Sequence, residues 1–263
     1  IRGNLIGVGT SGLSIANATN ATSDGIDIAT DSDGNTLGGT AAGQGNTIAF
    51  AQNFAINIAD NAGDTASDQN PIRGNSIYGN VGLGIDLDVP GVLVNDPGDG
   101  DLARANDGQN TPVLTGVTTT PTTATITGTI NSRVNSTYLI DFYASLAGDN
   151  NSSGRTHLGS ILVATNGAGN GAFAPTFTTA LAPGAKITAT ATSVTVPPIA
   201  PIDTPGSTSE FSNVVTTGAP GAPGNTISGT IFEDVNGDSG LGDAVGARNV
   251  TVHLWSDLFG APT

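Results

Sequence analysis

The first part of the chain repeats itself, and this feature constrains the fold more than any other. The tetrapeptide IRGN stands at Ile1–Asn4 and returns at Ile72–Asn75. The related segments GIDI, AINI and GIDL recur about every 30 residues, at Gly25–Ile28, Ala55–Ile58 and Gly84–Leu87. A period of that length is typical of stacked coils, in which each repeat completes the hydrophobic core of the next. The repeat therefore predicts a parallel β-helix over residues 1–94, with antiparallel hairpins of a sandwich as the alternative.

Two further features of the repeat predict how the coils would pack. Alternating aliphatic residues are expected to point inward and to stack from coil to coil; they are Ile26, Ile28, Ile56, Ile58, Ile85 and Leu87. Asparagines precede the aliphatic residues at the bends, as in Asn46-Thr-Ile and Asn75-Ser-Ile. Such side chains can bond the backbone of the adjacent coil and form ladders.

The character of the sequence changes after Asn110. Short alternating runs bounded by turn residues follow, such as Tyr138, Ile140, Phe142 and Ala144 around Asp141 and Tyr143. This pattern predicts an immunoglobulin-like β-sandwich over residues 111–217. The further runs are Ser160–Thr165, Ala172–Thr179, Lys186–Thr192 and Phe211–Thr216, and the proline-rich Val196–Pro205 is expected to be a loop.

The C-terminal part begins after a linker. GAPGAPG at residues 218–224 has linker composition. Residues 225–263 then read as a strand (226–234), a loop (235–249) and a second strand (250–257). Because two strands cannot form an independent core, we expect either that this domain is truncated or that another subunit completes it. The opening inside a repeat likewise suggests a piece of a longer chain.

Composition excludes several classes of function. The formal net charge is −15 and the pI about 4.1, which disfavours nucleic acid and anionic membranes as partners. The chain has no cysteine, so it has no disulfide, thiolate metal site or catalytic thiol. No apolar run approaches the roughly 18 residues of a membrane helix. An acidic chain without cysteine and rich in Thr, Asn and Gly suits the outside of a prokaryotic cell, where calcium can replace disulfides.

An acidic stretch, NDPGDGDLARANDGQN, separates the predicted β-helix from the predicted sandwich at residues 95–110. Its four aspartates are Asp96, Asp99, Asp101 and Asp107. Gathered carboxylates repel one another unless a cation or an arginine such as Arg104 offsets them, and Ca²⁺ accepts six to eight oxygens in irregular geometry. We therefore expect a Ca²⁺ site that stiffens this junction. The alternative is an acidic linker.

Residues 227–255, ISGTIFEDVNGDSGLGDAVGARNVTVHLW, resemble the start of the B-type repeat domains of serine-aspartate-repeat surface proteins, which are related to collagen-adhesin B domains. The resemblance implies a calcium-binding β-sandwich that serves as a stalk module. The ligand positions that match are Asp234, Asn236 and Asp238, whose spacing sets alternate oxygens around one cation. Asp243 follows one residue late, and Glu233 is expected to replace the missing bidentate glutamate. The alternative is a solvated acidic turn.

Residues 1–217 resemble a second group, the C-terminal part of large bacterial cell-surface proteins. The segments that carry this resemblance are RGNSIYGNVGLGIDLD (73–88), NDPGDGD (95–101) and GSTSEFSN (206–213). It implies right-handed parallel β-helix repeats, then an Asp-rich segment and a β-sandwich. It implies an architecture rather than an activity.

We expect an extracellular structural protein rather than an enzyme: a stalk, surface-layer, adhesin or filament subunit. Neighbouring copies of itself or other cell-surface proteins are the expected partners, and strand complementation would build a filament. The alternative is a β-helix protein that binds or cleaves polysaccharide, for which Arg2, Arg73 and the inward aspartates are the candidate residues. His157 and His253 are expected to be surface residues.

Overall fold

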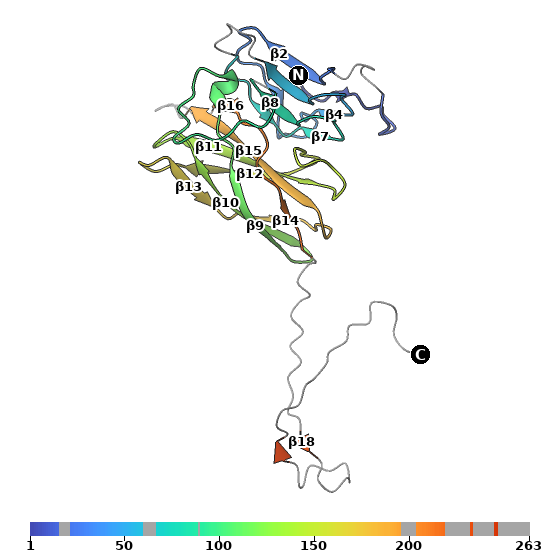
Figure 1. The fold of residues 1–263 in the computed structure, drawn as a ribbon. Coiled ribbons are helices and arrows are strands. Elements are labelled where there is room, and N and C mark those ends of the chain that lie inside the picture. The colour runs from blue at the N-terminus through green and yellow to red at the C-terminus, as the bar shows by residue number, and fades with distance from the viewer. Residues whose placement is uncertain are drawn as a thin grey trace. The chain divides into compact units, whose positions relative to one another are not determined.

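The computed structural model describes residues 1–15, 22–59, 67–88, 90–195 and 204–218, together with two short strands further on. It divides the chain into two compact units, Ile1–Ala222 and Pro223–Thr263. The described part is essentially all-β, with one short 3-10 helix, and Figure 1 shows its strands in three layers within the first unit. No helix among these residues has the length and hydropathy to span a membrane.

The N-terminal layer consists of three parallel sheets, ordered β1-β4-β7, β2-β5-β8 and β3-β6. We call it the parallel stack. Its strands are β1 (Leu5–Ile6), β2 (Ile26–Ala29), β3 (Leu37–Gly38), β4 (Thr47–Ala49), β5 (Ile56–Ala59), β6 (Ile72–Arg73), β7 (Ser76–Tyr78) and β8 (Ile85–Leu87). Ile26 pairs with Ile56, and Ile56 pairs with Ile85. Residues one sequence repeat apart therefore lie side by side on neighbouring strands. The six aliphatic residues predicted to point inward are all buried, which confirms that part of the prediction.

Asparagine ladders connect the coils, as the sequence predicted. The backbone N–H of Asn4 donates to Asn46 Oδ1, and that of Asn46 donates to Asn75 Oδ1, both at 3.0 Å. A second ladder runs from Asn35 through Asn70 to a residue of the acidic stretch described below. Each amide satisfies backbone groups at a bend, where no regular sheet bond is available.

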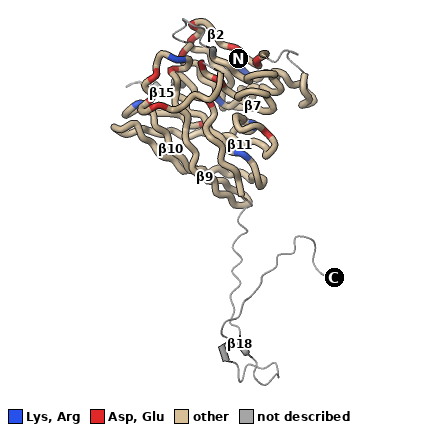
Figure 2. Tube along the Cα trace, viewed as in Figure 1, with Lys and Arg blue, Asp and Glu red and all other residues tan. Residues whose placement is uncertain are grey.

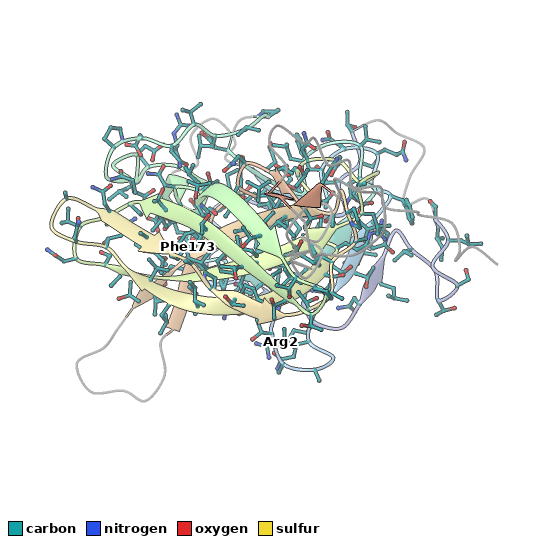
Figure 3. The ribbon with its side chains drawn as sticks, turned by 90° about the horizontal axis from the view of Figure 1, so that it is seen from below. Arg2 and Phe173 are labelled. Carbon is teal, nitrogen blue, oxygen red and sulfur yellow. The ribbon has the colours of Figure 1, made fainter. Side chains whose placement is uncertain are left out.

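Two antiparallel sheets form the other layers, and their facing side chains share one core, as in a β-sandwich. The four-stranded sheet contains β9, β10, β13 and β14, and the five-stranded sheet contains β11, β12, β15, β16 and β17. Their bounds are β9 (Val113–Thr119), β10 (Thr123–Asn131), β11 (Thr137–Ser145), β12 (Thr156–Ala164), β13 (Asn170–Phe173), β14 (Thr176–Thr178), β15 (Lys186–Thr195), β16 (Thr204–Thr208) and β17 (Val215–Thr216). Phe173, labelled in Figure 3, packs edge-on against Phe142, with ring centroids 5.4 Å apart.

The central strands of the five-stranded sheet, β11 and β15, are buried on both faces, which the sequence pattern did not indicate. Tyr138, Ile140 and Phe142 face the four-stranded sheet, as the alternation predicted. Asp141 and Tyr143 on the other face of β11 are also buried, at 0% and 2% exposure. They lie against the parallel stack, whose core includes Tyr143. The middle layer of Figure 1 is therefore shared between two cores.

The predicted run Phe211–Thr216 forms a strand only at its end, β17. Phe211 instead enters the core of the parallel stack and packs on Tyr143, with ring centroids 5.5 Å apart. In this region the backbone N–H groups of Ala189 and Ala191 in β15 donate hydrogen bonds to the hydroxyl oxygens of Ser212 and Ser209, both at 2.9 Å. Side-chain bonds thus replace part of the regular pairing.

The second unit is described only in β18 (Phe232–Glu233) and β19 (Val245–Gly246), which pair antiparallel. The strand β19 lies inside the stretch predicted as a loop, residues 235–249, so that prediction was too long. Asp234, Asn236, Asp238 and Asp243 lie outside the described residues, as does the side chain of Glu233 and the predicted strand 250–257. The proposed calcium loop of this unit stays a prediction.

Candidate functional site

The acidic stretch is fastened at both ends by asparagine side chains. The amide of Asn95 both donates to and accepts from the backbone of Thr111. The amide of Asn110 does the same with the backbone of Asp96. The two ends of the loop are therefore held side by side, which gives the intervening residues a fixed path.

Asp96, Asp99 and Asp101 gather within this loop. Each offers a carboxylate oxygen, and these oxygens all lie within 4.8 Å of one another. Gly98 and Asp99 have φ values of 76° and 58°, so a left-handed turn directs the three side chains together. We call these residues the aspartate cluster. It contains three of the four aspartates that the sequence predicted to bind Ca²⁺ in this stretch.

The deepest member of the cluster is Asp99, which is 1% exposed. Its Oδ1 accepts the backbone N–H of Asn110 at 2.7 Å, and its Oδ2 accepts the hydroxyl of Ser132 at 2.9 Å. Burial raises the pKa of Asp99 to about 6 despite these bonds. Burial, and then the charge of Asp96, also raise the pKa of Asp101. A proton or a bound cation would relieve this repulsion.

Two oxygens of the cluster, Asp96 Oδ1 and Asp101 Oδ1, are buried and accept no hydrogen bond from the described residues. Gly108 makes room for the second of them: its φ is 59°, and a Cβ atom there would lie 2.6 Å from Asp101 Oδ1. Buried, unpaired carboxylate oxygens are costly unless a cation or water pairs with them. The donor set, hard oxygens in a turn, suits Ca²⁺ better than a softer metal.

Two arginines offset part of the negative charge. Arg104 contacts Asp88, and its Nε lies 2.9 Å from Asp101 Oδ2. Arg133 lies 3.8 Å from Asp99 but closer, at 3.2 Å, to Asp107. Figure 2 shows acidic and basic residues near this junction, whereas β9 and β10 carry none. Because each arginine is shared between two carboxylates, the cluster keeps a net negative charge.

The fourth aspartate, Asp107, does not join the cluster. Its carboxylate accepts the Ser207 hydroxyl at 2.8 Å and pairs with Arg133. Its backbone N–H donates to Asp68 Oδ1 at 2.9 Å, and the N–H of Asp68 donates to Asp33 Oδ1 at 2.8 Å. Burial and the two neighbouring aspartates raise the pKa of Asp68 to about 6. Asp107 is thus the last rung of a column of aspartates along the parallel stack.

The helix η1 (Ala105–Gly108) therefore belongs to the stack. Asn70 donates its N–H to Asn106 Oδ1 at 3.0 Å, and Asn106 donates its side-chain amide to the carbonyl of Thr208 at 2.9 Å. The sequence shows only the first two levels of these ladders, since SDGN at residues 32–35 recurs as SDQN at 67–70. Asn106 and Asp107 stand in the reverse order, so no repeated motif marks the third level. One half of the acidic stretch completes the stack, and the other half forms the aspartate cluster.

The last coil of the stack is capped by the two-sheet region, the residues from β9 to β17. In the last strand of each parallel sheet, one backbone N–H donates a hydrogen bond to an acceptor in the two-sheet region. The three pairs are Ile72 N with Thr208 Oγ1 at 2.9 Å, Ile77 N with Gly154 O at 2.9 Å, and Leu87 N with Glu210 Oε1 at 3.1 Å. Glu210 is 2% exposed, and burial raises its pKa to about 7. No sequence pattern indicated this role of Glu210.

An ion-pair network crosses the same interface. Arg73 of β6 binds Asp141 of β11 through two nitrogens, at 2.6 and 3.0 Å. His157 Nε2 lies 2.8 Å from Asp141, and Ser160 also donates to that carboxylate. Burial alone would raise the pKa of Asp141, but the hydrogen bonds from His157 and Arg73 outweigh it and hold that pKa below its usual value.

Ser160, His157 and Asp141 lie close together, but their geometry does not activate the Ser160 hydroxyl as a nucleophile. The same ring nitrogen, His157 Nε2, lies 3.3 Å from Ser160 Oγ and 2.8 Å from Asp141. Activation of a serine needs one imidazole nitrogen on the hydroxyl and the other on the carboxylate. The arrangement holds two layers of the molecule together. His157, predicted to be a surface residue, is half-buried in this network.

Comparison of the chain with protein-family models and with curated protein sequences finds no match.

Proposed function

We propose that this chain is a structural module of an extracellular, cell-surface protein. In this proposal the parallel stack is a short right-handed β-helix, the two-sheet region is an immunoglobulin-like sandwich, and the two act as one rigid spacer. Shared cores, capped strands and the buried Arg73–Asp141 pair support a joint that transmits force rather than a hinge. The module would serve in a stalk, surface layer, adhesin or filament.

The proposal includes a Ca²⁺ ion in the aspartate cluster, and one observation carries it. Asp96 Oδ1 and Asp101 Oδ1 are buried without a hydrogen-bond partner, a few ångströms from the carboxylate of Asp99. A Ca²⁺ ion would pair both oxygens and neutralise the excess charge. Because Asn95 and Asn110 tie the loop to itself and Asp99 is bonded to Ser132, the ion would stiffen the start of the two-sheet region.

Calorimetric melting of the whole chain with and without Ca²⁺ tests this site. We expect Ca²⁺ to raise the melting temperature, with a stabilisation of about 3 kcal/mol at a concentration 100 times Kd. The double variant Asp96→Asn, Asp101→Asn should lose most of the increase. Asp27→Asn, at an exposed position of β2, is the control and should keep it.

Two results would reject the calcium site. One is a wild-type melting temperature that does not respond to millimolar Ca²⁺. The other is an equal response in the double variant, which would assign the effect to another site such as the loop of residues 233–243. Electron microscopy with and without a chelator then tests the structural role, since a calcium-dependent assembly is expected.

A further inference from the structure

The aspartate cluster has a cation of the chain itself beside it, the guanidinium of Arg104. Arg104 follows Asp101 by three residues in the same loop, and its Nε lies 2.9 Å from Asp101 Oδ2. Its Nη1 contacts the carboxylate of Asp88, the residue directly after β8. Arg104 therefore connects the cluster to the end of the last coil of the parallel stack.

The two oxygens of Asp101 differ in what they contact. Oδ2 pairs with Arg104, whereas Oδ1 is buried and accepts no hydrogen bond from the described residues. A metal ion that bound Oδ1 would therefore share one carboxylate with the guanidinium of Arg104. Two positive charges at one carboxylate repel each other, so each weakens the binding of the other.

The charge around the cluster decides how tightly it can hold Ca²⁺. Asp96, Asp99 and Asp101 supply three negative charges when all are ionised. Arg104 cancels part of this charge at the shortest range, because it touches a member of the cluster directly. The Ca²⁺ affinity of a site rises with the number of charged ligands that it keeps for the ion. Arg104 therefore lowers the affinity that the three carboxylates would have alone.

The second arginine nearby, Arg133, is held by another partner. Its Nε lies 3.8 Å from Asp99 Oδ2, which is beyond hydrogen-bond distance, while its Nη2 lies 3.2 Å from Asp107. Asp107 is itself fixed to the parallel stack through the bond from its N–H to Asp68. Arg104 is thus the arginine that pairs within the cluster.

Arg104 also has room to move. A hollow of about 620 Å³ adjoins the cluster and is lined by Asp88 and residues 100–104. The side chain of Arg104 is 38% exposed at this hollow, against 15% for Asp88. The guanidinium can therefore leave Asp101 without crossing a packed core, and it can keep its contact with Asp88.

We propose that Arg104 is a built-in competitor of the metal ion and regulates the calcium site. Without the ion, Arg104 pairs with Asp101 and reduces the repulsion among the carboxylates of the loop. When Ca²⁺ binds, Arg104 gives up Asp101 and pairs with Asp88 alone. This inference rests on the proposed calcium site and adds how the affinity of that site is set.

Calorimetric titration of the whole chain with Ca²⁺ tests the proposal. The binding that is absent from the double variant Asp96→Asn, Asp101→Asn identifies the site. Arg104→Gln removes the charge but keeps a hydrogen-bonding side chain, and it should raise the association constant at this site at least about tenfold. Arg104→Lys keeps the charge and should stay within about threefold of the wild type.

The matched control is Arg155→Gln, which removes the same charge from an arginine–aspartate pair in another loop, that with Asp149. It should leave the association constant within about threefold of the wild type. A gain as large as that of Arg104→Gln would mean that the net charge of the chain, and not the contact with Asp101, governs Ca²⁺ binding.

NMR of the arginine Nε–H groups in the wild type tests the exchange without any variant. Addition of Ca²⁺ should shift the Nε–H signal of Arg104 and speed its exchange with water, because this group loses its bond to Asp101. The signal of Arg155, whose Nε donates to Asp149, should stay in place.

Several results would overturn the proposal. An unchanged or lower association constant in Arg104→Gln would make Arg104 a bystander or a residue that positions Asp101. An equal gain in Arg104→Lys would exclude charge as the cause, and an Arg104 signal that does not respond to bound Ca²⁺ would exclude the exchange.

The same titrations separate this inference from the proposed calcium site. If the wild type binds Ca²⁺ at the cluster and Arg104→Gln gains nothing, only the role of Arg104 is rejected. If neither protein binds Ca²⁺ there, the calcium site is rejected and the role of Arg104 with it. Binding in Arg104→Gln but not in the wild type would support both, with the arginine as the stronger competitor.

Discussion

The two ends of the parallel stack are built from the same repeat but differ in what covers them. At the closed end the last strands find Thr208, Gly154 and Glu210, and the core continues into Tyr143 and Phe211. At the other end, in the first strands of the stack, Asn4 and Leu5 are exposed. Equivalent residues of one repeat should therefore contribute very different amounts to stability. The repeat sets which residues pair between strands, and the burial of a residue sets how much it stabilises the folded chain.

The largest effect is expected at the closed end, from Asp141→Ala. This change leaves Arg73 without its buried partner and should reduce the free energy of unfolding by about 3–5 kcal/mol. Urea denaturation measures it. Asp149→Ala, which removes the more exposed pair with Arg155 in the same region, is the control and should cost only about 1 kcal/mol. Equal losses would show that the Arg73–Asp141 pair does not fasten the closed end.

The next effect is a pH dependence centred on Glu210. Its pKa is raised from 4.5 to about 7, so the folded chain holds a proton that the unfolded chain has released. A raised carboxyl pKa means that stability is greatest at low pH and declines as the pH rises from about 4.5 to 7, by roughly 3 kcal/mol for this group. Asp68 and Asp99 contribute in the same direction up to about pH 6.

Urea denaturation in chelator at a series of pH values checks this. Wild type should become less stable between pH 5 and 7, and Glu210→Gln should flatten the upper part of that curve. A curve that rises with pH in wild type would mean that the Glu210 carboxylate is stabilised by a charge partner instead of destabilised by burial.

The smallest effects come from matched positions of one ladder. Asn75→Ala removes an acceptor that two groups of Asn46 use in a buried site, and it should cost about 2 kcal/mol. Asn4→Ala removes the equivalent side chain at an exposed position and should cost about 0.5 kcal/mol or less. Thermal unfolding gives both values. Similar costs would mean that the two ends are equally covered.

Much of the stack could be predicted from the sequence because its determinants are local and periodic. The recurrence of Ile26, Ile56 and Ile85 fixed the register, and the recurrence of Asn46 and Asn75 indicated a ladder. The strand β11 likewise followed from alternation, since one of its faces fills the core between the two antiparallel sheets. The gathering of Asp96, Asp99 and Asp101 followed from a Gly-rich turn of short reach.

The sequence did not indicate where Asp107 would lie. It stands six residues after Asp101, yet its partners are Asp68, Arg133 and Ser207, which are far from it along the chain. The roles of Asp141 and Glu210 were hidden for the same reason. A buried carboxylate in a strand has no local signature, because its burial depends on which layer packs over it.

The sequence by itself determined that the chain is all-β, that its first part stacks in register, and that its acids gather between two regions. Periodicity encodes these properties, since each repeat meets its own copy. Only the tertiary structure decided that the acidic stretch divides into a ladder rung and an aspartate cluster, and that the central strands of the five-stranded sheet are buried on both faces. These depend on contacts between segments that share no pattern, and the free energy of burial selects among such contacts only once the layers are assembled.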